Sequence, residues 1–150
     1  DLRRTAPRQH LIHLPRLPGT RKALVSMHTT WANDPVNSPN HYTRSHPGME
    51  CIELTADTSF CLGNAIKYLW RYHSKGRPVE DLEKARWYLC RVIDYGEKIA
   101  WTRQQYDILT ALVAHTVGVE ARTWAKLKQG YPDSALALID ELIKRERDKQ

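Results

Sequence analysis

The chain has 150 residues, of which 41% are hydrophobic and 27% charged, and a formal net charge of +6. This length suits one domain with a real core and is too short to favour two. No apolar run approaches the ~18 residues that cross a bilayer, and the three cysteines form no C-x-x-C pair, which argues against a membrane protein, a disulfide framework and a zinc site. We therefore expect a cytoplasmic protein with no protein-bound structural metal.

Most of the positive charge lies at the front of the chain. Residues 1–26 carry six basic side chains and one acidic one, are rich in Pro, and show no periodic apolar face. We predict a disordered N-terminal extension over residues 1–30 and a single helical domain over residues 31–150. A solvated arm is favoured over an arm that binds a phosphate backbone, so nucleic acid is not an expected partner.

An ordered loop is predicted from Trp31 to Pro47, where three prolines and several Asn and Ser favour turns. A helix from Ser59 to His73 should follow, with Asp57 or Thr58 as its cap. Its apolar residues recur at helical spacing: Leu62, Ile66, Leu69 and Trp70.

A second helix should begin at Pro78, after the loop Lys75-Gly76-Arg77. Acidic residues at its amino end complement the helix dipole. Its apolar stripe consists of Leu82, Ala85, Leu89, Val92 and Ile93. Two amphipathic helices joined by a short loop predict an antiparallel hairpin.

Further helices are predicted at residues 108–117 and 122–128, and a last one after Pro132. The last helix should bury one face, formed by Leu136, Ile139, Leu142 and Ile143, and should end in a charged, fraying segment over residues 144–150. No run alternates with period two. The predicted fold is all-α and compact, with a core module at residues 34–95 and additional C-terminal helices at residues 100–148.

The polar face of the first predicted helix carries Asn64, Lys67, Tyr68 and Arg71, which share one side. Lys67 and Arg71 form a like-charged i, i+4 pair, which is better tolerated when an anion lies between them. Two more cations follow in the loop, and three aromatic residues are interleaved: Tyr68, Trp70 and Tyr72. This combination favours a phosphate site with a base-stacking platform, and a solvated basic face is the alternative.

The second helix presents a strip of Asp81, Lys84, Trp87, Tyr88 and Arg91, and the hairpin should bring both strips to one cleft. These residues also have explanations that involve no ligand. Asp81 and Lys84 could form a surface helix pair, and Trp87 and Tyr88 could pack in or at the rim of the core. The chain has no phosphate loop, G-x-G-x-x-G motif or nucleophile elbow.

Acidic residues offer a further alternative. Five carboxylates could bind magnesium as in helical nucleotide pyrophosphohydrolases: Glu50, Glu53, Glu80, Asp81 and Glu83. Acidity at the start of a helix explains the last three equally well.

Three blocks in order, DPVNSPNHYT, MECIE and FCLGNAIKYLWRYHSKGRPVEDLEKARWYL, resemble a known family. It is a family of small bacteriophage proteins catalogued as a domain of unknown function, and it includes the early nucleotide kinase of T-odd coliphages. The resemblance covers about residues 34–93. The matching residues are Asn37, His41 and Tyr42 in the first block, and Asn64, Lys67, Tyr68, Arg71, Lys75, Gly76, Asp81, Lys84, Trp87, Tyr88 and Leu89 in the last.

The resemblance implies a homo-oligomeric phage protein that acts on nucleotides in the cytoplasm of the infected host. In the kinase member, phosphate passes from ATP with Mg²⁺ to dTMP or dGMP. We hypothesise that Lys67, Arg71, Lys75 and Lys84 hold phosphates, that Asn64 and His41 orient them, that Tyr42, Tyr68 and Tyr88 contact the base or sugar, and that Asp81 positions magnesium. Asn37 and Trp87 complete the expected nucleotide-binding set, and Lys67, Arg71 and Asp81 the catalytic one.

Two rival functions use the same residues. A non-catalytic sponge would sequester a nucleotide or a nucleotide-derived immune signal of the host. A magnesium-dependent nucleotide hydrolase is the third candidate. The feature that separates kinase from sponge is a metal-binding carboxylate facing the basic strip.

Overall fold

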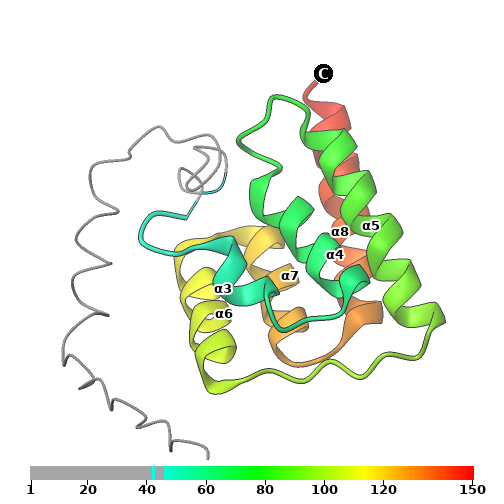
Figure 1. Cartoon of the computed structure of the whole chain (residues 1–150). Coiled ribbons are helices and arrows are strands. Elements are labelled where there is room, and N and C mark those ends of the chain that lie inside the picture. Colours follow the sequence, from blue (N-terminus) through cyan, green and yellow to red (C-terminus); the bar gives the residue numbers. More distant parts are fainter. Residues whose placement is uncertain (1–41, 43–45) are drawn as a thin grey trace, which may run out of the picture. The chain divides into compact units, whose positions relative to one another are not determined.

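The computed structural model describes residue 42 and residues 46–150, and these form six helices and no strand (Figure 1). The helices are α3 (Cys51–Thr55), α4 (Phe60–Arg71), α5 (Pro78–Asp94), α6 (Arg103–His115), α7 (Gly118–Lys128) and α8 (Pro132–Asp148). The predicted all-α fold is confirmed for these residues, and the predicted N-terminal arm lies outside them. None of the helices described is long and apolar enough to span a membrane.

The start of α4 corrects the predicted cap. Neither Asp57 nor Thr58 caps the helix: the N-cap is Ser59, whose side chain accepts a hydrogen bond from the backbone N–H of Leu62. The Thr58 hydroxyl donates instead to the carbonyl oxygen of Thr55, at the end of the short helix α3. At its other end α4 stops at Arg71, two residues before the predicted end.

Helices α4 and α5 form the predicted antiparallel hairpin (Figure 1). Helix α5 begins at Pro78 as predicted, with acidic residues in its first turn. The apolar stripes of both helices are buried, and of the residues predicted for them only Ile93 is half-buried. On the polar side of the hairpin, Asp81 and Lys84 of α5 meet Arg71 and Tyr68 of α4.

The remaining helices close a ring around the core. Helix α5 packs on α8, α8 on α7, α7 on α6, and α6 on α3, which returns to α4. Two fully buried indoles, Trp70 of α4 and Trp124 of α7, meet inside this ring with their ring centres 6.4 Å apart. The hairpin that carries the predicted site is thus backed by a core that includes the C-terminal helices.

The C-terminal helices occur where predicted, with shifted ends. Helix α6 begins at Arg103, five residues before the predicted start, because Thr102 and Gln105 form a reciprocal capping box. Helix α8 continues to Asp148 rather than fraying from residue 144. Ion pairs along its last turns extend it, including Arg147 with Glu83 of α5.

Candidate functional site

Three cations from two helices gather on one aromatic ring. Lys67 Nζ lies 4.3 Å from the centre of the Tyr68 ring, Arg71 Cζ lies 4.7 Å from it, and Lys84 Nζ of α5 lies 5.5 Å from it. The face of a phenol ring attracts cations, which partly offsets their mutual repulsion. The structure therefore brings Lys84 of the second predicted strip to the first strip. We call this group the Tyr68 cluster.

The second feature of the cluster is a nearly buried ion pair between the two helices. Arg71 Nε donates to Asp81 Oδ2 and Arg71 Nη2 to Asp81 Oδ1, both at 3.2 Å. The Asp81 residue is only 3% exposed, and the Arg71 side chain 13%. Burial alone would lower the pKa of Arg71, but the hydrogen bonds and charge of Asp81 outweigh it and raise that pKa. This guanidinium stays charged and is fixed in orientation.

The pairing corrects the sequence interpretation of Asp81. The sequence also allowed Asp81 to form a surface helix pair with Lys84, as the alternative to a role in positioning magnesium. In the structure, Lys84 Nζ instead donates to Glu80 Oε1 at 2.5 Å, one turn earlier on α5. The hydrogen bond to Glu80 raises the pKa of Lys84. Glu80 also accepts from Arg77.

Lys67 differs from the other two cations of the cluster. Its ammonium group donates to the amide oxygen of Asn64 at 2.7 Å, and it has no carboxylate partner among the residues described. Since Arg71 and Lys84 are each paired with a carboxylate, Lys67 carries the uncompensated charge of the Tyr68 cluster. It is the group best suited to receive an anion.

Aromatic rings extend the cluster along the hairpin. The Tyr68 and Tyr88 rings are stacked, with centres 5.9 Å apart and planes within 12°. Trp70 and Tyr72, predicted as part of the base-stacking platform, are buried in the core and cannot serve it. Trp70 belongs to the apolar stripe of α4, and the Tyr72 hydroxyl donates to Glu120 of α7.

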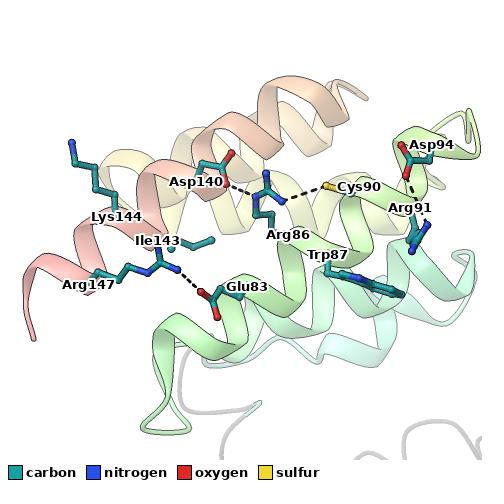
Figure 2. A pocket seen from close by; sticks show the side chains of 10 residues that line it. All are labelled: Glu83, Arg86, Trp87, Cys90, Arg91, Asp94, Asp140, Ile143, Lys144 and Arg147. Carbon is teal, nitrogen blue, oxygen red and sulfur yellow. Dashed lines mark hydrogen bonds and ion pairs between the residues drawn. The ribbon is translucent and has the colours of Figure 1, made fainter.

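Trp87 lies at the margin of the Tyr68 cluster. Its ring meets Tyr88 edge-on at 4.9 Å, but it is 53% exposed and lies beneath the Arg91 guanidinium. It lines a groove of about 690 Å³ between α5 and α8, which is bridged by the pairs Arg86–Asp140 and Arg147–Glu83 (Figure 2). This groove is a separate surface from the Tyr68 cluster.

Four further residues were predicted for the site, and the structure describes two of them, Tyr42 and Lys75. Tyr42 is near the cluster: its side chain hydrogen-bonds with Arg71, and its carbonyl oxygen accepts from Trp70 Nε1 at 2.8 Å. Lys75 is exposed in the loop between α4 and α5. Asn37 and His41 lie outside the described residues, so their predicted roles stay predictions.

The carboxylates near the Tyr68 cluster do not fit a magnesium ion. Asp81 directs both oxygens at Arg71, so a cation there would have to displace a guanidinium from a nearly buried pair. Glu80 is engaged by Lys84 and Arg77, and Glu83 by Arg147. Over residues 46–150 and residue 42, no three His, Cys, Asp or Glu side chains are placed to hold a metal ion.

One residue of this face is absent from the predicted site. Phe60, at the first position of α4, contacts the Tyr88 ring edge-on at 5.9 Å and is 74% exposed. The sequence analysis assigned Phe60 no role in the site. Its position four residues before Asn64, on the same helix face, is the signal that could have identified it.

Comparison with known proteins adds one finding. A family model described as a protein of unknown function, DUF3310, matches residues 36–90. This segment therefore carries a domain of unknown function, and its limits agree with the predicted resemblance over residues 34–93. No curated protein matches the chain, and no solved structure does. The matched segment contains α3, α4 and most of α5, and so the whole Tyr68 cluster.

Proposed function

We propose that this chain is a nucleotide-binding protein and that the Tyr68 cluster receives the nucleotide phosphate. The observation that supports the proposal is the gathering of Lys67, Arg71 and Lys84 on one tyrosine ring. Among the residues that the structure describes, Lys67 has no carboxylate partner. Three cations at this spacing repel one another, and a bound phosphate would relieve that repulsion. Charge-assisted bonds to its oxygens would add to the affinity.

Each member of the cluster has a distinct proposed role. Lys67 supplies the free positive charge, and Arg71, oriented by Asp81, supplies a guanidinium edge of fixed direction. Lys84 approaches from α5 and can turn from Glu80 to the ligand, since both side chains are nearly half exposed. Tyr68 and Tyr88 provide aromatic surface for the base or sugar.

The catalytic form of this proposal is a nucleoside monophosphate kinase that uses ATP with Mg²⁺. The family resemblance supports it, and positioning with charge neutralisation is most of what phosphoryl transfer requires. The non-catalytic form is a sponge that retains a nucleotide or a nucleotide-derived signal. One observation favours the sponge: Asp81, the carboxylate proposed to position magnesium, is committed to Arg71.

Calorimetric titration with a panel of nucleoside monophosphates tests the binding proposal. Replacing Lys67 by Ala should weaken binding by about 1.5–3 kcal/mol, the range for hydrogen bonds to charged groups, or roughly tenfold to 150-fold. Lys128→Ala is a matched control, because Lys128 Nζ also lies over a tyrosine ring, 4.9 Å from that of Tyr106, away from the cluster. This control should bind like the wild type.

The same samples, supplied with ATP and magnesium, separate the two forms. Diphosphate products that disappear with Lys67→Ala would establish the kinase. Tight retention of a nucleotide without turnover would establish the sponge. No affinity for any nucleotide, or equal affinity of the wild type and Lys67→Ala, would refute the proposed site.

A further inference from the structure

An exposed phenylalanine heads the face of α4 that carries the cations. Phe60, Asn64, Lys67 and Arg71 follow one another at intervals of three or four residues, and so lie along one side of the helix. Phe60 is 74% exposed, the highest exposure of any phenylalanine, tyrosine or tryptophan among the residues described. A ring left this open contributes little to folding, because the hydrophobic gain scales with the area removed from water.

Hydrogen bonds on both sides of Phe60 fix the backbone that carries this ring. Ser59 caps the helix directly before Phe60, and its hydroxyl donates to Glu97 Oε2 at 2.5 Å. The carbonyl oxygen of Phe60 accepts from Asn64 Nδ2 at 2.8 Å. Phe60 is therefore an open aromatic surface on a fixed support, joined through Asn64 to Lys67.

The rings on this side form a continuous row. Phe60 meets Tyr88 edge-on at 5.9 Å, and Tyr88 stacks on Tyr68 at 5.9 Å, where the three cations gather. The row has an aromatic end at Phe60 and a charged end at Lys67. Seven residues of helix separate the two ends, a rise of roughly 10 Å.

We propose that Phe60 is a specificity-determining residue that, with Tyr88, binds the base of the nucleotide whose phosphate lies at Lys67 and Arg71. The inference rests on the proposed function. It places the base at the Phe60 end of the row of rings and the phosphate at the Lys67 end. Purines and pyrimidines offer flat faces, which pair with aromatic rings in stacked or edge-to-face arrangements. The ligand class is accordingly a base-bearing phosphate ester, discriminated from sugar phosphates without a base.

The test compares a nucleoside monophosphate with ribose 5-phosphate, on the wild-type chain and on Phe60→Ala. The wild type should bind the nucleotide more tightly, on the order of ten- to a hundredfold, the range for stacking one base on an aromatic side chain. Phe60→Ala should lose most of this ratio and keep its affinity for ribose 5-phosphate. Phe60→Trp should restore the ratio.

Tyr131→Ala serves as the control, because Tyr131 is also an exposed ring beside a lysine, 5.8 Å from Lys126 Nζ. It should leave both affinities unchanged. Circular dichroism and size-exclusion chromatography would show whether each variant keeps its fold and its assembly state.

Three results would overturn the inference. An unchanged ratio in Phe60→Ala would show that the base does not contact this ring. Equal weakening of both ligands would assign Phe60 to the phosphate end or to folding. An altered assembly state with an unchanged ratio would assign it to a protein interface. Failure of the wild type to bind either ligand would instead refute the proposed function itself.

Discussion

Replacing Asp81 by Asn leaves the Arg71 guanidinium without its ion-pair partner in a site where both side chains are largely buried. The two side chains are 4% and 13% exposed and share two hydrogen bonds of 3.2 Å. Removing one member of a buried pair costs about 3–5 kcal/mol, because the remaining charge is left uncompensated. Arg71 lies at the rim of the core, so we expect a loss near the lower limit, about 3 kcal/mol.

Urea unfolding of the wild type, Asp81→Asn, Arg71→Met and the double variant measures this coupling. The double variant should be destabilised by much less than the sum of the single changes, because it removes both charges together. The same cycle on Glu80 and Lys84, an exposed pair on α5, is the matched control and should give no coupling beyond experimental error. If the Arg71–Asp81 cycle is no more strongly coupled than this control, the pair does not hold the hairpin together.

Two further predictions concern α4 and the buried histidine. Ser59→Ala should lower the free energy of unfolding by about 1 kcal/mol, the usual cost of losing an N-cap, as measured by urea unfolding. Burial lowers the pKa of His46 below 6.5, despite the attraction of Glu120, and the charges of His73 and His115 act in the same direction as burial. As the pH falls, the His46 imidazole is therefore protonated in the unfolded chain before it is protonated in the folded chain. The free energy of unfolding should consequently decrease below pH 6.5, until the pH has passed the pKa of His46 in the folded state. Thermal unfolding across this range should show a flatter profile for His46→Gln, and an equally steep one would contradict the assignment.

Much of the fold follows from local sequence signals. The stop at Lys75-Gly76-Arg77 and the start at Pro78 fix the hairpin, and the apolar spacing of each helix identifies the face that is buried. The cap of α4 could not be chosen in this way. Asp57, Thr58 and Ser59 are all good capping residues, and only the backbone of the preceding turn decides which one is used.

The aromatic residues show where local signals become ambiguous. Trp70 fits the apolar stripe of α4 by spacing, yet a tryptophan among cations also suggests a ligand platform. Its partners in the core, Trp124 and His46, come from distant parts of the chain, so the choice depends on tertiary contacts. Tyr72 is buried for the same reason, because its hydroxyl partner Glu120 belongs to α7.

For the candidate site, the sequence predicts which side chains meet but not how their charges pair. The spacing on each helix and the short loop are enough to bring Lys67, Arg71 and Lys84 together. From the sequence, Asp81 could pair with either of two cations, Lys84 on its own helix or Arg71 on α4. The rotation of α5 about its axis, set by its buried stripe, turns Asp81 inward to Arg71 and leaves Glu80 for Lys84.

The pairing gives Asp81 a structural role, and under the proposed function it also orients a ligand-binding group. Its carboxylate links α5 to the last turn of α4 and thereby fixes the direction of the Arg71 guanidinium. The carboxylate can fix Arg71 because it is buried and because both of its oxygens accept hydrogen bonds from that guanidinium. A magnesium ligand, by contrast, must face the water and phosphate that complete the coordination of the ion.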